Sequence, residues 1–321
     1  MTTAVVTVTL NPAIDRTVTV DRLTLGEVHR ARSSLSNAGG KGVNVAGCLA
    51  DWGITPIVTG VLGRDNTVPF EAFFAAKGID DRFVRAPGET RTNIKIADLA
   101  TGETTDVNLP GLAVSTATYD AVWETLRAVV RRGTLVVVAG SLPENLPAVT
   151  LAVLVSDLTR LGARVVLDTS GEPLARALAP EIRHLPHAIK PNRAELEDFA
   201  GRPLPDEAAI VAAARELVSR GIRLVAVSRG AEGAVFVTAD EALVARLPPV
   251  AALSTVGAGD AMVAGMVAGL ATDAPLAEIA RLGVAFAAAK LAGVGPNLPS
   301  REAVRDLAAA AELRPVDVWE V

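Results

Sequence analysis

The amino-acid sequence predicts an α/β fold with a mostly parallel central sheet and a smaller sheet at one end. From about residue 114 onward, short apolar β-branched runs alternate with longer helical patterns, which is typical of βα units on a parallel sheet. Two other stretches alternate polar and apolar residues, as in Thr17-Val18-Thr19-Val20, and predict strands with one face in water. The chain has 321 residues, half of them hydrophobic, so it can bury a large core without disulfides.

The central sheet is predicted from short runs that are apolar on both faces. The leading strand covers residues 5–10, and three more cover 135–139, 164–167 and 224–227. Helical spacing predicts helices over 41–52, 148–161 and 207–220. The apolar run 261–271 is shorter than the roughly 20 residues that a membrane span needs, so we predict a buried helix there and no membrane association.

The two alternating stretches define the expected domain organisation. We expect residues 1–12, 35–88 and 112–321 to form the core, and residues 13–34 and 89–111 to form a discontinuous, antiparallel lid. Such a lid at one end of an α/β sheet would exclude water from a site beneath it.

Composition excludes several classes of function. The formal charge is −5 and no basic run is longer than Arg131-Arg132, which argues against nucleic acid as a partner. With three histidines and the single Cys48, the composition argues against a transition-metal site, and Cys48 is interpreted as a small buried residue. The N-terminus has no secretory signal pattern, so we expect a cytoplasmic protein.

The strongest chemical signal is Thr255-Val256-Gly257-Ala258-Gly259-Asp260, which opens a long helical run. Glycines let a phosphate approach the backbone, and the helix N-terminus offers unpaired N–H groups and a positive dipole end. Asp260 in the first turn should stay ionised and could accept the proton of a hydroxyl that attacks phosphorus. The alternative is an ordinary helix cap. A Walker loop and a dinucleotide fingerprint are both disfavoured, the latter because position 262 is Met.

A second glycine cluster, Asn37 to Asn44, also opens a helix. Gly39 and Gly40 would let backbone amides approach a ligand, Asn44 could bond sugar hydroxyls, and Lys41 could supply a point charge for a phosphate. A flexible turn is the alternative interpretation.

Two residues at the predicted sheet edge and lid complete a possible sugar site. Asp15 follows the first strand, where open α/β sheets bind ligands, and could accept bonds from vicinal hydroxyls. Arg91 would bring a fork-shaped cation from the lid onto a phosphate. Taken alone, Asp15 and Arg91 are each equally consistent with a structural role, as a turn residue or as a solvated charge on a strand.

Two further motifs point to a nucleotide. In Lys190-Pro191-Asn192-x-x-Glu195, the oxygens of Asn192 and Glu195 share a helix face and could hold a hydrated Mg²⁺, with a capping box as the structural alternative. The segment from Ser228 to Gly233 follows a strand and could bring backbone amides to a nucleotide, although glycine-rich hairpins are common.

Taken in order, these blocks resemble the PfkB (ribokinase-like) carbohydrate kinases, and the resemblance covers nearly the whole chain. Gly140-Ser141-Leu142-Pro143 and Asp168-Thr169-Ser170-Gly171 stand in the family order with the motifs above. Within the family the sequence is most similar to the bacterial 1-phosphofructokinases, on Leu10 to Asp15, Gly26-Glu27-Val28, Gly39 to Ala46, Arg91 to Lys95 and Gly102 to Asn108.

The resemblance implies a three-layer α/β/α sandwich with a β lid that often serves in dimerisation, so a homodimer through the lid is expected. It also implies transfer of the ATP γ-phosphoryl group, with Mg²⁺, to the 6-hydroxyl of fructose 1-phosphate. Tagatose 6-phosphate and fructose 6-phosphate remain alternative substrates. A catalytically silent regulator is a more distant alternative, disfavoured because Asp260 and its glycines are intact.

The family match also implies roles for individual residues. Asp260 would be the base, with Gly257, Ala258 and Gly259 as its anion hole, and Glu195 would bind Mg²⁺ through water. The sugar phosphate would contact Asp15, Gly39, Gly40, Lys41, Asn44, Arg91 and Ser141. The nucleotide would contact Lys190, Asn192, Thr255, Gly257, Gly259 and the segment Ser228, Arg229, Gly230, Ala231, Glu232 and Gly233. Arg229 stands where relatives usually carry Leu, and we expect it to alter the charge near ATP without abolishing binding.

Overall fold

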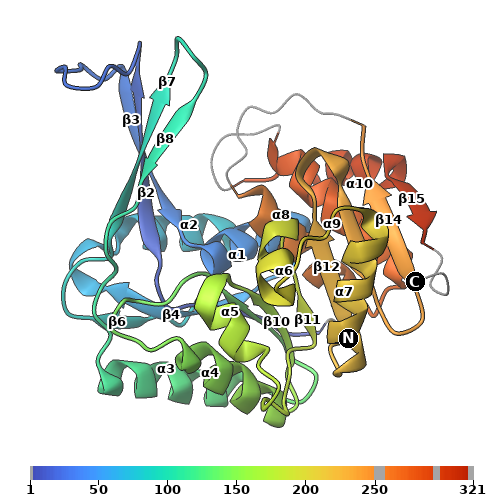
Figure 1. Cartoon of the computed structure of the whole chain (residues 1–321). Coiled ribbons are helices and arrows are strands. Elements are labelled where there is room, and N and C mark those ends of the chain that lie inside the picture. The colour runs from blue at the N-terminus through green and yellow to red at the C-terminus, as the bar shows by residue number, and fades with distance from the viewer. Residues whose placement is uncertain (1–2, 249–256, 292–296, 317–321) are drawn as a thin grey trace.

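The computed structural model describes residues 3–248, 257–291 and 297–316, and within them the fold is a three-layer α/β/α sandwich with a projecting small sheet (Figure 1). The large sheet has eleven strands in the order β15-β14-β13-β12-β11-β10-β9-β1-β4-β5, with β6 also pairing with β4. Neighbouring strands from β12 through β11, β10, β9 and β1 to β4 pair in parallel. The pairs β12–β13, β13–β14 and β14–β15 are antiparallel. The strands are β1 (Val5–Thr9), β4 (Ile57–Gly63), β5 (Asp80–Asp81), β6 (Val84–Ala86), β9 (Leu135–Ala139), β10 (Arg164–Asp168), β11 (Ala188–Ile189), β12 (Leu224–Ser228), β13 (Ala234–Val237), β14 (Ala242–Arg246) and β15 (Glu312–Pro315).

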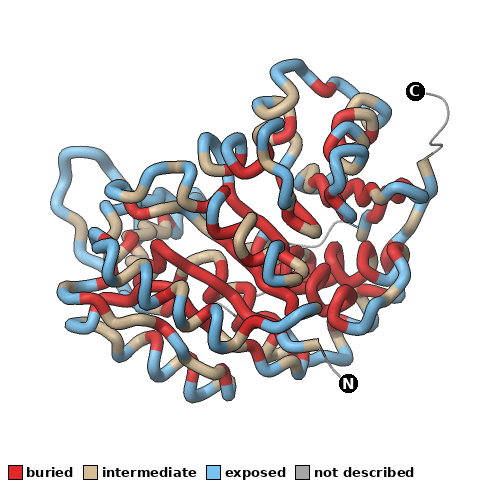
Figure 2. Tube along the Cα trace, turned by 90° about the horizontal axis from the view of Figure 1, so that it is seen from below, coloured by how far each residue is buried: buried red, intermediate tan, exposed pale blue. Residues whose placement is uncertain are grey.

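Helices cover both faces of this sheet, because its strands are apolar on both sides. Val136 and Val138 of β9 pack into one core, beneath α3 to α7, while Leu135 and Val137 pack into the other, beneath α1, α8, α9 and α10. Figure 2 shows buried residues running through the centre of the body, with exposed residues outside. The helices are α1 (Lys41–Trp52), α2 (Val68–Lys77), α3 (Thr116–Val129), α4 (Val149–Arg160), α5 (Gly171–Ala177), α6 (Arg193–Ala200), α7 (Glu207–Ser219), α8 (Ala258–Leu270), α9 (Leu276–Leu291) and α10 (Arg301–Ala310).

The predicted α/β class is confirmed, and the elements lie close to the predicted ranges. The helix predicted over 41–52 has those bounds, and the helices predicted over 148–161 and 207–220 are α4 and α7. The apolar run after Asp260 belongs to α8, which begins earlier, at Ala258. No helix among the described residues is both long and apolar enough to span a membrane.

The small sheet differs from the prediction in two respects. It contains β3 (Ser33–Gly39), β2 (Ala13–Val20), β7 (Thr92–Asp98) and β8 (Thr104–Val107), in that order. The β2–β3 and β7–β8 pairs are antiparallel, but β2 and β7 are parallel, so the predicted antiparallel sheet is mixed. The reason is that two separate hairpins leave the body in the same direction and meet along their first strands (Figure 1). Strand β3 also continues to Gly39, five residues beyond the predicted lid boundary at 34.

The parallel strands bring the motifs of the chain to one edge of the large sheet. Strand β1 lies between β4 and β9, so the chain continues the sheet on one side of β1 with β4 and later on the other side with β9. The segments that follow β1, β9, β10, β11 and β12 contain Asn11, Ser141, Thr169, Lys190 and Arg229. Carboxyl ends of parallel strands meet at the same edge, where open α/β sheets bind ligands. The small sheet leaves the body from this edge, because β2 follows β1 directly.

Candidate active site

The first feature of the site is the N-terminus of α8. Gly257 caps the helix in a left-handed conformation (φ 81°) that residues with a side chain rarely adopt. Asp260 lies in the first turn and is buried, with 7% of its surface exposed. Gly259 faces Lys190, whose Nζ would lie 3.6 Å from a β-carbon placed on that glycine. The motif therefore does form a glycine-lined helix N-terminus with a buried carboxylate, and a lysine stands beside it.

The electrostatics of Asp260 differ from the expectation based on the helix dipole alone. Burial, followed by the negative charge of Asp168, raises the pKa of Asp260 to about 6. A hydrogen bond from Asn44 Nδ2 to Asp260 Oδ2, at 2.7 Å, and the charges of Lys41 and Lys190 act in the opposite direction. A carboxyl group with a pKa near 6 is mainly ionised at neutral pH and is basic enough to accept a proton from a hydroxyl.

Asp168, which the sequence analysis did not assign to the site, holds two lysines together. Its side chain is 1% exposed, and it lies 3.1 Å from Lys41 Nζ and 3.4 Å from Lys190 Nζ, one ammonium on each carboxylate oxygen. Although burial lowers the pKa of Lys41, the carboxylates of Asp168, Asp260 and Glu195 raise it above its ordinary value. The available signal was the polar Asp168-Thr169-Ser170-Gly171 segment at the end of a buried strand.

This arrangement changes the interpretation of Lys41 and Asn44. Lys41 was expected on the phosphate that the sugar already carries, and the structure pairs it with Asp168, close enough to Asp260 for that carboxylate to raise its pKa. Asn44 was expected on sugar hydroxyls, and its amide nitrogen instead donates to Asp260. Both residues sit at the start of α1, with Gly40 as its N-cap (φ 111°).

Asp15 stands at the base of the small sheet, as predicted. A side chain at Gly39 would approach Asp15 Oδ2 to 2.7 Å, which explains a glycine at that position. Asn93 of β7, which the sequence analysis did not assign, donates to Asp15 Oδ1 at 3.3 Å. Burial raises the pKa of Asp15, although Lys95 and the bond from Asn93 favour its charged form. The site thus has a third carboxylate besides Asp260 and Asp168, on the lid side.

Arg91 is anchored to the backbone in this structure. Its guanidinium donates to the carbonyls of Asn11 (3.2 Å), Pro12 (3.3 Å) and Leu109 (3.1 Å), which join the loop after β1 to the end of the lid. Asn11 in turn donates to Ser141 Oγ at 3.0 Å, so Arg91 and Ser141 belong to one network. Three of the five N–H donors of Arg91 are occupied, and the other two are not assigned to a protein partner among the described residues.

We expect the Arg91→Ala variant to raise the KM for the sugar phosphate about tenfold, because it loses both a cation and the link between loop and lid. The KM for the nucleotide should change much less, since none of the three contacts lies on that side of the site. Steady-state kinetics with each substrate varied in turn measures both values. Arg16→Ala, on the exposed part of β2, is the control; an unchanged sugar-phosphate KM in Arg91→Ala would place the phosphate elsewhere.

A mostly apolar cavity of about 450 Å³ adjoins the N-terminus of α8, and none of its lining residues belongs to the small sheet. The loop after β12 forms one wall through Ser228, Gly230, Ala231 and Gly233, and Ala258 and Gly259 lie at the end nearest the carboxylate. Helix α9, which the sequence left unassigned, supplies Val284, Ala287, Ala288 and Leu291. A flat apolar base would fit between these walls with its phosphates directed at α8.

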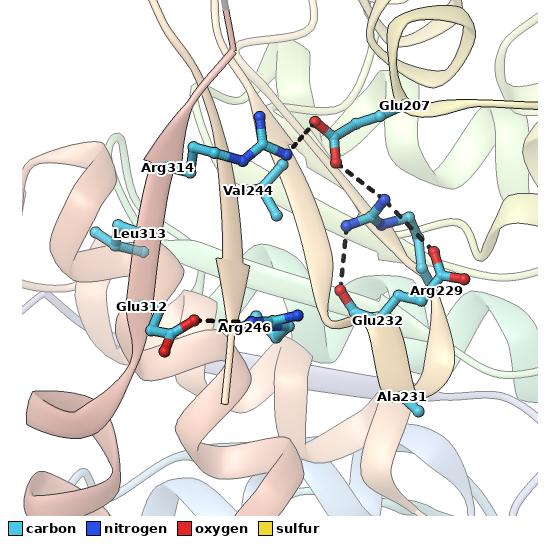
Figure 3. Close-up of a pocket in the computed structure, with 9 residues that line it drawn as sticks. All are labelled: Glu207, Arg229, Ala231, Glu232, Val244, Arg246, Glu312, Leu313 and Arg314. Atoms are coloured by element: carbon cyan, nitrogen blue, oxygen red, sulfur yellow. Dashed lines mark hydrogen bonds and ion pairs between the residues drawn. The ribbon is translucent and has the colours of Figure 1, made fainter. Parts of the chain in front are cut away.

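Two residues of the same loop face away from this cavity. Arg229 and Glu232 line a separate charged pocket, together with Glu207, Arg246, Glu312 and Arg314 (Figure 3). Arg229 donates to Glu207 Oε2 and to the Glu232 carbonyl, each at 3.1 Å, and Glu207 also binds Arg314 at 2.6 Å. The expectation that the Arg229 charge acts next to ATP is therefore not met, because the side chain pairs with α7 behind the loop.

This geometry predicts a modest, selective effect of Arg229→Leu. The guanidinium holds the glycine-containing loop by its bond to the Glu232 carbonyl, so its removal should raise the KM for the nucleotide a few-fold and leave the sugar-phosphate KM unchanged. Kinetics with the nucleotide varied measures this effect. Arg246→Leu is the matched control, because Arg246 lines the same pocket but pairs with Glu312, on β15. Equal effects of the two substitutions would contradict the prediction.

The capping box at the start of α6 is confirmed. Asn192 Oδ1 accepts from the Glu195 backbone N–H, and Glu195 Oε2 accepts from the Asn192 N–H, each at 2.8 Å. The other carboxylate oxygen of Glu195 takes no part in these two hydrogen bonds of the capping box. The described residues contain no cluster of three histidine, cysteine, aspartate or glutamate side chains that could hold a metal ion. Thr255 lies outside the described residues.

Comparisons with known proteins show the family of the chain. Residues 5–303 match the model of the "pfkB family carbohydrate kinase". The chain belongs to the pfkB family of carbohydrate kinases. This pfkB-family chain is 50% identical to a 1-phosphofructokinase of Xanthomonas campestris pv. campestris, over 97% of this chain and 98% of the relative. It is 46% identical to a 1-phosphofructokinase of Rhodobacter capsulatus, over 96% of both chains.

Solved structures place the pfkB-family chain on the same fold. Phosphofructokinase-2 from Escherichia coli, in complex with fructose-6-phosphate, superposes with a TM-score of 0.89 at 30% identity, over 96% of this chain and 98% of that one. The predicted three-layer sandwich with a separate small sheet is confirmed by this similarity and by the strand order.

Proposed function

We propose that this chain transfers the γ-phosphoryl group of ATP to the 6-hydroxyl of fructose 1-phosphate and yields fructose 1,6-bisphosphate. The observation that carries the proposal is the buried Asp260 at the N-terminus of α8, with Asn44 bonded to it and Lys41 and Lys190 on the neighbouring Asp168. The substrate assignment is supported by the 1-phosphofructokinases that are 50% and 46% identical over nearly the full chain.

Each part of the site has a use in phosphoryl transfer. Asp260, ionised at neutral pH, accepts the proton of the attacking hydroxyl, while Asn44 fixes the orientation of the carboxylate. The backbone N–H groups behind Gly257, together with Lys41 and Lys190, neutralise negative charge on the transferred group. The lid side, with Asp15, Arg91 and Ser141, would hold the sugar phosphate, and the apolar cavity beside α9 would hold the base of ATP.

The residues present fit a Mg²⁺ ion that is bound mainly by the phosphates of the nucleotide, with few ligands from the protein. Mg²⁺ usually keeps several waters and binds one or two carboxylates together with substrate phosphates. The oxygen of Glu195 that is free of the capping box is the protein group we assign to it, through water. Bound there, the ion would neutralise phosphate charge beside Lys190.

A substrate panel tests the proposal. ADP release is measured with fructose 1-phosphate, fructose 6-phosphate and tagatose 6-phosphate, and we expect the highest kcat/KM for fructose 1-phosphate. A preference for either of the other sugar phosphates would overturn the assignment of fructose 1-phosphate. The chain would still be a sugar-phosphate kinase. Calorimetry that detects binding of nucleotide and sugar phosphate without turnover would instead favour a silent regulator.

We further propose that two copies associate through the lid. Apolar side chains project from it into solvent, with Leu25 93% and Val28 97% exposed, and Leu35, Leu99 and Val107 are also exposed. Burying such a patch against a second copy would be favourable. We expect Val28→Asp to shift the mass measured by sedimentation from dimer to monomer, whereas Val153→Asp, an exposed site on α4, should not. A wild-type protein that sediments as a monomer would contradict the proposal.

A further inference from the structure

Lys290 is a buried lysine on α9 to which neither the fold nor the proposed mechanism has assigned a role. It is 5% exposed, although the neighbouring positions on its helix are mainly alanine and leucine. Lysine is almost never fully buried unless its charge has a use or a partner, because desolvation of an ammonium is costly. Its position near the end of an otherwise apolar helix therefore requires an explanation.

The side chain of Lys290 lies against the anion hole. A β-carbon placed on Gly257 would approach Lys290 Cε to 3.3 Å, so the end of the lysine occupies the space beside the N-cap of α8. Helices α8 and α9 are held in close contact: a β-carbon on Gly269 of α8 would meet Ile279 of α9 at 2.8 Å. This close packing of the two helices fixes the position of Lys290 relative to the first turn of α8.

The charges around Lys290 single out Asp260. Burial lowers the pKa of Lys290, while Cys48 and Asp260 act to raise it. Cys48 is itself buried and carries no charge at neutral pH, because burial raises the pKa of its thiol to about 12. The Asp260 carboxylate is thus the ionised neighbour that favours the ammonium form, and the ammonium in turn favours ionised Asp260.

We propose that Lys290 is a positioning residue for phosphoryl transfer, whose ammonium supplies a fixed positive charge behind the anion hole at Gly257. Lys41 and Lys190 neutralise charge from the side of Asp168, and Lys290 does so from the side of Gly257, through the backbone of the α8 N-terminus. A fixed charge in a site that excludes water stabilises the negative phosphoryl group more than the same charge in solvent does. This inference rests on the proposed function.

The test uses Lys290→Met, which keeps the length and the apolar stem of the side chain and removes the charge. We expect kcat to fall on the order of tenfold, less than for a donor in direct contact with the transferred group. The KM for the sugar phosphate should stay unchanged, and the acid limb of kcat/KM should move to higher pH because Asp260 loses a favourable charge. Lys77→Met is the matched control: Lys77 is also mostly buried, and it pairs with Asp51, which lies in the last turn of α1, at the opposite end of that helix from Lys41.

A purely structural role would give a different result. If Lys290 only supports packing, a folded Lys290→Met enzyme would keep the wild-type kcat and pH profile, and the proposal would be overturned. If Lys290→Met does not fold, Lys290→Ala is assayed with added propylammonium chloride, against tetramethylammonium chloride as the salt control. Recovery of kcat with propylammonium alone supports the proposal, and equal rates with both salts overturn it.

The outcome is separable from that of the substrate assignment. If the wild-type enzyme prefers a sugar phosphate other than fructose 1-phosphate, the proposed substrate is wrong, and the comparison of variants is made on the preferred sugar. Lys290 acts on the transferred phosphoryl group and not on the sugar, so the expected loss of kcat is the same.

Discussion

Replacing Asp260 by Asn should lower kcat on the order of a hundredfold or more while leaving the fold intact. The loss corresponds to removal of a positioned general base. Asn has the same shape, and its amide oxygen can still accept the 2.7 Å bond from Asn44, so the first turn of α8 should be unchanged. Because a buried charge is removed, the thermal midpoint should be equal or higher.

The measurement is single-turnover and steady-state phosphorylation of fructose 1-phosphate, together with the affinity for ATP by calorimetry. ATP affinity should stay close to that of the wild type, since Asp260 acts on the hydroxyl. Asp273→Asn is the control: it removes an exposed carboxylate that pairs with Arg164, and turnover should not change. Near-normal turnover in Asp260→Asn would exclude Asp260 as the base.

Asp168→Asn is the second large change, and it should affect both stability and the pH dependence of activity. Asp168 is the carboxylate that Lys41 and the buried Lys190 share. Removing one partner of a buried ion pair leaves the other charge uncompensated and costs about 3–5 kcal/mol in the free energy of unfolding. Urea unfolding monitored by circular dichroism measures this loss, with Asp157→Asn, on α4, as the control.

The pH effect of Asp168→Asn follows from the raised pKa of Asp260. Activity requires ionised Asp260, so in the wild type kcat/KM should fall as the pH drops below about 6. The negative charge of Asp168 is one cause of that raised pKa, so its removal should move the acid limb to lower pH. The substrate phosphate also titrates near pH 6, but a substitution in the enzyme cannot shift that limb. An unmoved limb in Asp168→Asn would assign it to the substrate.

Local patterns in the sequence were sufficient for the elements and for the individual motifs. The bounds of α1 and the capping box of Asn192 and Glu195 depend on residues a few positions apart, whose preferences are expressed locally. The same holds for the glycine-lined start of α8 with Asp260 in its first turn. The rule that open α/β sheets bind ligands at the carboxyl ends of their strands also led to Asp15 at the edge of the sheet.

The direction in which a side chain points, and its partner, were not accessible in this way. Arg229 was expected beside the nucleotide but pairs with Glu207 behind the loop, and Arg91, expected on a phosphate, also donates to three backbone carbonyls. The sequence shows a charged residue on a loop or at a strand end, and several partners for that charge are equally compatible with the pattern.

What the sequence by itself determined about this protein is the α/β fold, the glycine-lined helix N-terminus and Asp260 as the candidate base. Only the tertiary structure decided that Asp168 joins Lys41, 127 residues away, to Lys190, that Asn44 orients Asp260 across 216 residues, and that Lys290 lies behind Gly257. The physical reason is that backbone preferences act within a few residues. The neutralisation of a buried charge depends on which distant side chains the packed sheet and helices bring within a few ångströms.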